Sequence, residues 1–150
     1  MPTYPFYSLR AVINESLRIH PTNSLGLPRV VPVHGTGVTI CNKFFPAGTV
    51  LSVPTWTIHH SKEIWGSNAD DFVPERWYSL TETQKKAFMA WGIGPRQCTG
   101  RNVAEMEVML IIATIVRRYD FVLYDQVLVT SEGFLNKPVS CEIGIKKRLG

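Results

Sequence analysis

The start of the chain combines apolar and charged positions at helical spacing. The segment from Leu9 to Ile19 contains no proline or glycine, and Pro21 follows it, so the pattern predicts a helix that ends before this proline. Glu15 and Arg18 are three residues apart and would share one face of that helix. Its packing side is predicted to consist of Val12, Ile13, Ser16 and Leu17.

The middle of the chain changes to short apolar runs separated by glycine and proline. Residues 30–33, 38–41 and 49–54 predict short strands of a small sheet. Residues 58–65 predict short helical turns. Residues 67–87 are polar and interrupted by proline, which predicts irregular structure.

The C-terminal part predicts one long helix followed by strands. Residues 102–116 are apolar on nearly all sides except Glu105 and Glu107, which predicts a buried helix that is too short and too charged to span a membrane. Residues 121–123, 126–129 and 139–145 predict strands, with a turn-rich tip at residues 133–138. Helices and strands together predict an α+β fold class.

The charge of the chain is modestly basic, with a net value of +4 and a pI of about 9.1. The basic residues are scattered without interleaved aromatic residues, a pattern that excludes a nucleic-acid-binding surface. Some of them flank the region around Cys98, where they indicate either a solvated face or a surface that steers a partner. These residues are Lys85, Lys86, Arg101, Arg117 and Arg118.

The chain has three cysteines, Cys41, Cys98 and Cys141, without the spacing or the histidine pair of a zinc site. The odd number indicates a reducing compartment without a disulfide framework. Cys41 and Cys141 lie in strand-like runs and are predicted to be small buried hydrophobic residues. The neighbouring His59 and His60 would point in different directions, so they do not predict a metal site.

Cys98 differs from the other cysteines because it lies in the segment from Trp91 to Gly100, here called the cysteine loop, directly before the long helix. A cysteine that binds iron must be ionised, and the N-terminus of a following helix supplies positive potential. Gly94 and Gly100 would let the backbone turn tightly and approach a flat cofactor, and Arg96 can reach a carboxylate. The combination predicts a haem-thiolate loop, whereas a lone cysteine would predict an inert core thiol.

At this point the chain resembles the cytochromes P-450, whose cysteine loop has an aromatic residue, glycine, arginine, cysteine and glycine at these spacings. Residues 15–18, Glu-Ser-Leu-Arg, resemble the Glu-x-x-Arg helix of the family, and residues 72–77, Phe-Val-Pro-Glu-Arg-Trp, resemble its meander. The resemblance implies that residues 1–150 are a partial domain, the C-terminal third of the mostly helical cytochrome P-450 fold. Its parts would be the Glu-x-x-Arg helix, the small sheet, the meander, the cysteine loop, the buried helix and the terminal strands.

The resemblance implies haem b as the cofactor, with Cys98 as the axial ligand of the iron and Arg96 as the contact to a haem propionate. Trp91, Gly94 and Gly100 would also contact the cofactor. Trp91 departs from the family, which usually has phenylalanine at this position. Its indole N–H could donate to the thiolate and raise the potential of the iron.

The resemblance also implies that Arg76 joins Glu15 and Arg18 in a buried structural triad that fixes the meander against the helix. A carboxylate between two guanidinium groups can be fully paired, and loss of one member strands a buried charge. Further residues would face the substrate, with ordinary packing as the alternative. These residues are Val30, Val31, Pro32, Phe134 and Leu135.

The implied activity is that of a monooxygenase that inserts one oxygen atom from O2 into a small organic substrate. A thiolate ligand favours cleavage of the O–O bond, and the electrons would come from NADPH through a separate flavin-containing reductase. Residues 27–32, 100–107 and 117–119 most resemble fungal members, above all benzoate para-hydroxylases, which favours an aromatic substrate. The alternatives are a non-catalytic truncated product, or a haem-thiolate isomerase or peroxygenase that needs no reductase.

A complete member of this kind is expected at the endoplasmic reticulum membrane. Its membrane anchor and the distal helix that relays protons to oxygen are expected to lie outside this chain. The sequence contains no signal peptide and no transmembrane run. The chain by itself is therefore expected to be cytosolic and inactive.

Overall fold

The computed structural model describes residues 5–124 and 128–148. The helices are α1 (Pro5–Ile19), α2 (Thr55–His59), α3 (Lys62–Trp65), η1 (Pro74–Tyr78), α4 (Glu82–Ala87), η2 (Gly94–Arg96) and α5 (Arg101–Arg118). The strands are β1 (Arg29–Val30), β2 (Gly37–Ile40), β3 (Lys43–Pro46), β4 (Val50–Leu51), β5 (Tyr119–Leu123), β6 (Thr130–Ser131), β7 (Lys137–Pro138) and β8 (Ile143–Lys147). The predicted α+β class is confirmed.

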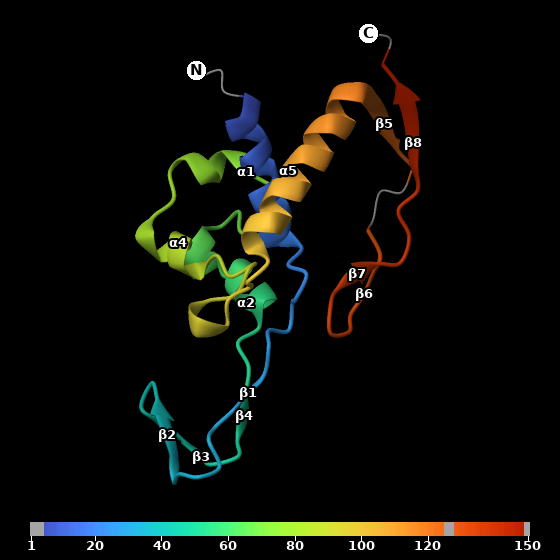
Figure 1. The fold of residues 1–150 in the computed structure, drawn as a ribbon. Helices are drawn as coiled ribbons and strands as arrows, with labels where there is room; N and C mark the ends of the chain where they lie inside the picture. The colour runs from blue at the N-terminus through green and yellow to red at the C-terminus, as the bar shows by residue number, and fades with distance from the viewer. Residues whose placement is uncertain (1–4, 125–127, 149–150) are drawn as a thin grey trace.

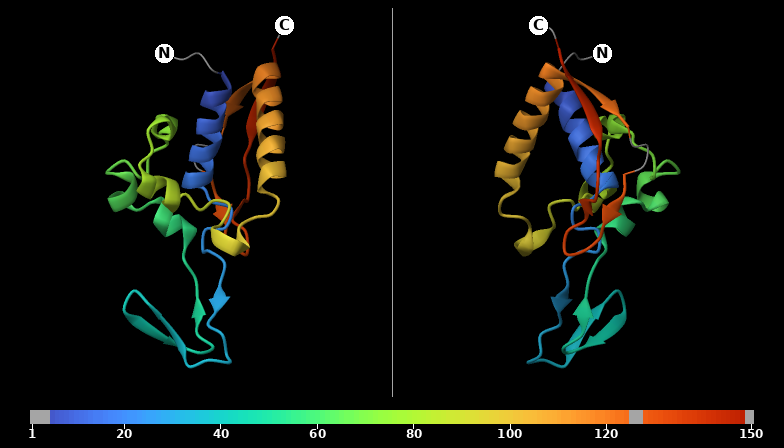
Figure 2. Two further views of the ribbon diagram at one scale, coloured as in Figure 1. Left: turned by 60° about the vertical axis from the view of Figure 1, so that its left-hand side comes forward. Right: turned by 90° about the vertical axis from the view of Figure 1, so that its right-hand side faces the viewer.

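The two long helices α1 and α5 lie side by side and form the centre of the molecule (Figures 1 and 2). The short helices α2, α3 and α4 gather on one side of α1, and the β5–β8 ladder continues from the end of α5. The ladder of β1 and β4 leads away from this body to the projecting β2–β3 hairpin.

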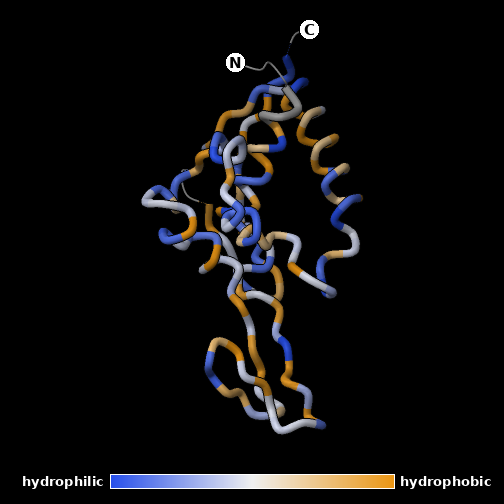
Figure 3. The backbone as a smooth tube through the Cα atoms, turned by 90° about the vertical axis from the view of Figure 1, so that its left-hand side faces the viewer, coloured by the Kyte–Doolittle hydropathy of each residue, from blue (hydrophilic) through white to orange (hydrophobic). Residues whose placement is uncertain are grey.

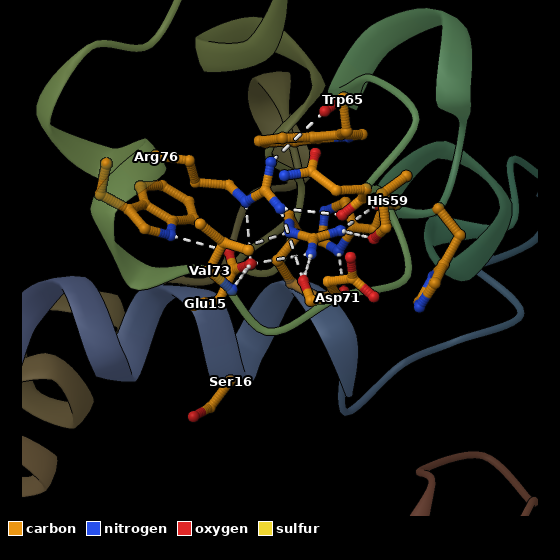
Figure 4. Close-up of polar contacts among 12 residues, drawn as sticks. Glu15, Ser16, His59, Trp65, Asp71, Val73 and Arg76 are labelled. Atoms are coloured by element: carbon orange, nitrogen blue, oxygen red, sulfur yellow. Dashed lines mark hydrogen bonds and ion pairs between the residues drawn. The ribbon is translucent and has the colours of Figure 1, made fainter.

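The first helix is confirmed, but its predicted packing side is only partly right, because Ile13 and Leu17 are half-buried and line a cavity next to α5. Val12 and Ser16 are exposed, whereas Ala11, Glu15 and Arg18 are buried. In Figure 4 the side chain of Ser16 points away from the polar contacts that surround Glu15. The charged face of α1 is buried because later segments of the chain form ion pairs and hydrogen bonds with it. The pattern of hydrophobic residues along one helix cannot predict this orientation.

The predicted small sheet is replaced by two separate two-stranded antiparallel ladders, β1–β4 and β2–β3. Strand β3 was not predicted. It exists because Cys41 and Asn42, with φ of 48° and 61°, form a two-residue turn that folds the chain back into a hairpin. Cys41 is therefore an exposed turn residue, and its predicted role as a buried strand residue is wrong.

The region between the ladders and the cysteine loop contains the main apolar cluster. Trp65, Ala69 and Ala87 form its buried centre, and partly buried Ile58, Ile64, Trp77, Leu80 and Phe88 pack against it. The short helical turns predicted at residues 58–65 are confirmed by α2 and α3. The irregular structure predicted for residues 67–87 is wrong at η1 and at α4, where Thr81 and Gln84 form a reciprocal capping box.

The long helix predicted at residues 102–116 is confirmed as α5, but its predicted burial is wrong. None of its residues is buried, and Met106 and Leu110 are 65% and 68% exposed. Burial of a helix that is apolar on all sides requires neighbours all around it. In the described residues α5 contacts α1 along one side and β5 at its end, which leaves the other apolar sides open.

The C-terminal strands are only partly as predicted. Residues 121–123 lie in β5 and residues 143–145 lie in β8, as expected, whereas residues 128–129 and 139–142 are not strands and residues 126–127 lie outside the described residues. Strand β5 pairs with β8, and the unpredicted strands β6 and β7 pair with each other. Cys141 lies between β7 and β8 and is exposed, so its predicted burial is also wrong.

No helix within residues 5–124 and 128–148 is long and apolar enough to cross a bilayer. Hydrophobic and polar stretches alternate along the backbone, and hydrophobic residues also occur in the projecting β2–β3 hairpin (Figure 3). Val38, Ile40 and Phe44 of this hairpin are among its exposed apolar residues.

Candidate functional site

The side chain of Glu15 is fully buried at the centre of a polar network that joins α1 to the meander (Figure 4). Arg18 donates to both carboxylate oxygens, through Nε to Oε2 at 2.9 Å and through Nη2 to Oε1 at 2.8 Å. Arg76 Nε and the backbone N–H of Val73 donate to Oε1 at 2.8 and 2.9 Å, and Trp77 Nε1 donates to Oε2 at 2.9 Å. The structure thus brings the three predicted triad residues together.

The hydrogen bonds of Glu15 decide its protonation state. Burial alone would raise the pKa of this carboxyl group, but hydrogen bonds from Arg18, Val73, Arg76 and Trp77 outweigh burial and lower the pKa below 4.5. The group is therefore a carboxylate at neutral pH. A paired, ionised Glu15 in the interior acts as a structural anchor rather than as a proton donor.

Arg18 extends the network to three backbone carbonyl groups. Its Nη1 donates to the carbonyl oxygens of His59 and Ala69, both at 2.6 Å, and Nη2 donates to the carbonyl oxygen of Asp71 at 3.1 Å. The guanidinium group also lies over the ring of Trp65, 5.2 Å from its centroid. Arg18 is fully buried, and these contacts together with Glu15 use all of its nitrogen atoms.

Arg76 plays the corresponding part in the meander. Its Nη2 donates to the carbonyl oxygens of Asn68 and Asp71 at 3.0 and 3.4 Å, and Nη1 donates to that of Trp65 at 3.3 Å. Both arginines therefore bind the Asp71 carbonyl as well as Glu15. The triad fixes the segment from residue 65 to residue 77 around α1.

His59 belongs to the same network, although nothing in the sequence marks it beyond the pair of adjacent histidines. The backbone N–H of Met89 donates to His59 Nε2 at 2.9 Å, so Nε2 is unprotonated. The proton is on Nδ1, which donates to the carbonyl oxygen of Arg18 at 3.0 Å. Burial lowers the pKa of His59 from 6.5 to about 4, which keeps the ring neutral.

The cysteine loop is shaped by backbone hydrogen bonds. The N–H of Gly92 donates to the carbonyl oxygen of Met89, and the N–H of Cys98 donates to that of Trp91, both at 2.8 Å. Gly92 and Gly94 both have φ of 74°, a conformation that favours glycine. Gly100 has φ of −84° and caps the start of α5. The tight turn therefore depends on Gly92, which the sequence analysis missed, and on Gly94, and not on Gly100.

The predicted iron ligand Cys98 lies on this loop, close to the N-terminus of α5, and is exposed. A Cβ atom on Gly100 would lie 3.9 Å from the Cys98 sulfur, and one on Gly94 would have no neighbouring atom within 4 Å. Arg96, at the end of η2, is also exposed. The thiol and the guanidinium group are thus both accessible to a ligand from outside the chain.

The indole of Trp91 lies between α1 and α5, where it lines a small cavity of about 50 Å³ with Ile13, Leu17, Val108 and others. A cofactor pocket typically has a volume of about 300–1,000 Å³, so this cavity does not hold the cofactor. The Nε1 atom of Trp91 is buried and has no hydrogen-bond partner in the structure. The hydrogen bond to the Cys98 sulfur that the sequence suggested is therefore not formed here.

The predicted substrate-facing residues lie in two places. Val30 is 58% exposed in β1, Pro32 is exposed after it, and Val31 between them is buried. Phe134 and Leu135 are 77% and 49% exposed at the tip between β6 and β7. Hydrogen bonds join this tip to residues 22–24, from Asn23 Nδ2 to the carbonyl oxygen of Phe134 and from the N–H of Asn136 to that of Thr22. Burial of Val31 agrees with the packing alternative.

The five basic residues near the cysteine loop do not form one compact patch. Lys85 pairs with Glu82, and Arg101 with Glu105, both at 2.7 Å. Arg101 and Arg118 occupy opposite ends of α5 and are about 25 Å apart along it.

Comparisons with known proteins agree with this arrangement. A sequence model of the cytochrome P-450 family matches residues 7–144. Benzoate 4-monooxygenase bphA of Aspergillus niger is 49% identical over 143 residues, which cover 93% of this chain and 28% of that protein. Pisatin demethylase of Fusarium vanettenii is 42% identical over 75% of this chain and 22% of its own length. The crystal structure of a cytochrome P-450 matches 94% of this chain and 32% of its own, with a TM-score of 0.79 and 26% identity.

The chain therefore belongs to the cytochrome P-450 family. It spans 28% of the length of benzoate 4-monooxygenase bphA, so the match covers a minor part of that relative. Membership of this family implies a haem cofactor.

Proposed function

We propose that residues 1–150 form the C-terminal, haem-ligating third of a monooxygenase that oxidises a small aromatic substrate. The observation that carries this proposal is the exposed Cys98 on a loop anchored through glycines and backbone hydrogen bonds directly before α5, in a chain of the cytochrome P-450 family. The order of the triad helix, the meander and the cysteine loop supports the assignment to the C-terminal third.

The residues of the cysteine loop fit a haem. Gly94 leaves open space where a side chain would stand, which suits close approach of a flat macrocycle. The Cys98 sulfur is accessible, and the positive end of the α5 dipole lies near it.

Each residue of the loop has a distinct role in this proposal. Cys98 holds the iron, Arg96 pairs with a propionate, and Gly94, Gly100 and Trp91 border the macrocycle. A thiolate-ligated haem supplies activation of molecular oxygen, because the thiolate pushes electron density toward the iron and favours O–O cleavage. The exposed Val30, Pro32, Phe134 and Leu135 would contact the substrate, and Val31 would support them from the interior.

The remaining partners follow from the same proposal. Electrons would come from NADPH through a flavin-containing reductase, and the complete protein would act at the endoplasmic reticulum membrane. An aromatic acid is the preferred substrate class, which the 49% identity to benzoate 4-monooxygenase bphA supports. A peroxygenase or isomerase would share Cys98 and dispense with the reductase.

The iron ligand is tested in a chimera in which residues 7–144 replace the matching segment of the Aspergillus niger benzoate 4-monooxygenase. We expect the reduced chimera with carbon monoxide to give the red-shifted Soret band of thiolate ligation, and Cys98→Ala to abolish that band while folding is retained. Cys141→Ala, which changes another exposed cysteine, is the matched control and should leave the band unchanged. A Cys98→Ala chimera that keeps the band would refute the assignment.

The chain alone is expected to be inactive, because apolar residues on α5 and on the projecting hairpin are exposed. At low micromolar concentration it should bind a hydrophobic dye. With haem, reductase and NADPH it should give no coupled product from benzoate or a panel of small aromatic compounds, as measured by the ratio of product to NADPH consumed. Coupled hydroxylation would contradict this expectation, whereas the chimera should turn over under the same conditions.

A further inference from the structure

A buried histidine joins the triad to the chain that enters the cysteine loop. His59 and Arg18 are connected twice, because Arg18 Nη1 donates to the carbonyl oxygen of His59 and His59 Nδ1 donates to that of Arg18. Figure 4 shows the His59 side chain directed into this network. The imidazole is fully buried, stacks on Phe88 with ring centroids 5.5 Å apart, and meets Trp65 edge-on.

The second ring nitrogen reaches a different part of the fold. Phe88 directly follows α4, and the next residue, Met89, donates its backbone N–H to His59 Nε2. The carbonyl oxygen of Met89 accepts the N–H of Gly92, and the carbonyl oxygen of Trp91 accepts the N–H of Cys98. Hydrogen bonds therefore lead from Arg18 through His59 and Met89 to Gly92, and the neighbouring residue Trp91 continues the connection to Cys98.

We propose that His59 is a positioning residue that couples the triad to the cysteine loop by holding the backbone N–H of Met89. Only the functional consequence of this proposal rests on the assignment of Cys98 as the iron ligand. The mechanical link itself concerns backbone order and can be measured without haem. Neutral imidazole suits this position because it offers one donor to the Arg18 carbonyl and one acceptor to the Met89 amide.

Two substitutions of His59 separate the two hydrogen bonds. In His59→Gln the side-chain oxygen reaches the position of Nε2 and can accept from Met89, whereas in His59→Asn the side-chain amide reaches the position of Nδ1 and can donate to Arg18. Hydrogen exchange of the full 150-residue chain, resolved to single amides, reports the outcome. The amides of Val73 and Val31, which bond to Glu15 and Thr49, serve as references outside the loop.

We expect His59→Asn to speed exchange at Met89, Gly92 and Cys98 about tenfold relative to the references, the loss expected for one buried hydrogen bond. His59→Gln should stay within about threefold of the unsubstituted chain. Equal exchange in His59→Asn and the unsubstituted chain would overturn the proposal. If His59→Asn and His59→Gln lose the same protection from exchange in the loop while the reference amides stay protected, the ring acts through packing alone. That result also overturns the proposal.

A second pair of variants removes the same bond from its other end and leaves His59 in place, so it decides the matter if the His59 variants do not fold. Met89→Pro deletes the donor N–H, and Phe88 before it is already extended, with φ of −75° and ψ of 99°. Ala90→Pro is the matched control, because Ala90 is the second residue of the turn closed by Met89 and Gly92, where proline is favoured. If hydrogen exchange at Cys98 is faster in Met89→Pro but not in Ala90→Pro, the proposal is supported. Equal exchange in both variants overturns it.

The functional consequence is measured in the chimera. His59→Asn should lower the fraction of the reduced carbon monoxide complex that has the thiolate-type Soret band, and His59→Gln should restore it. If the unsubstituted chimera lacks this band, the proposed function fails, while the exchange results still decide the link between His59 and the loop. If the band is present and both variants match it, the coupling through His59 is refuted.

Discussion

Replacement of Glu15 by glutamine should lower the free energy of unfolding of the chain by about 3–5 kcal/mol. The substitution keeps the volume of the side chain but removes the charge that pairs with Arg18 and Arg76. It also places an NH2 group against donors, because every contact of the Glu15 carboxylate described above is a donated hydrogen bond. Since domains are typically stable by about 5–15 kcal/mol, this loss would unfold a large part of the population under mild denaturant.

Glu82→Gln is the matched control for this experiment. Glu82 forms an ion pair with Lys85 at 2.7 Å, but both side chains are exposed, so its loss should change the free energy of unfolding by about 0.5 kcal/mol or less. Denaturant unfolding, followed by circular dichroism, compares the two variants. A Glu15→Gln chain as stable as the Glu82→Gln chain would show that the network contributes no more than a surface pair.

Acid should destabilise the chain well above the pH at which carboxylates protonate. The pKa of His59 is about 4 in the folded protein and 6.5 when exposed, so between these values the unfolded state binds a proton that the folded state excludes. Stability is therefore fully present above pH 6.5, decreases as the pH falls, and levels off below about pH 4. The total loss from this group is about 3 kcal/mol.

The surroundings of His59 include Arg18 and Glu15 on α1 and His60 beside it in sequence. Glu15 has a lowered pKa, so its own contribution is lost only at pH values below 4.5. His20 has a pKa lowered by burial and by His60, so its contribution is also lost as the pH falls below 6.5. His59→Gln should flatten the stability profile between pH 6.5 and 4, whereas replacement of the exposed His34 by glutamine should not. An unchanged slope in His59→Gln would assign the acid sensitivity to another group.

Local sequence patterns predicted the elements whose cause is local. The helix α1 ends before Pro21, as expected, and the helix α5 follows the cysteine loop. The hairpin turn at Cys41 and Asn42 was missed, since a strand-like run continues into it and nothing in the composition marks two consecutive left-handed residues. The burial of α5 was predicted wrongly because apolar composition shows that a helix is suited to burial, but not which segments pack against it.

The sequence by itself determined the family of this protein, because the spacing from Trp91 to Gly100, together with Glu15, Arg18 and Arg76, indicates a cytochrome P-450. Only the tertiary structure decided which further groups complete the network. Trp77 donates its indole N–H to Glu15, and His59 accepts the amide of Met89, across 62 and 30 positions of the chain. Such contacts depend on how separate segments pack, because a hydrogen bond is fixed by distance and direction in space, whereas a sequence pattern records only order and spacing along the chain.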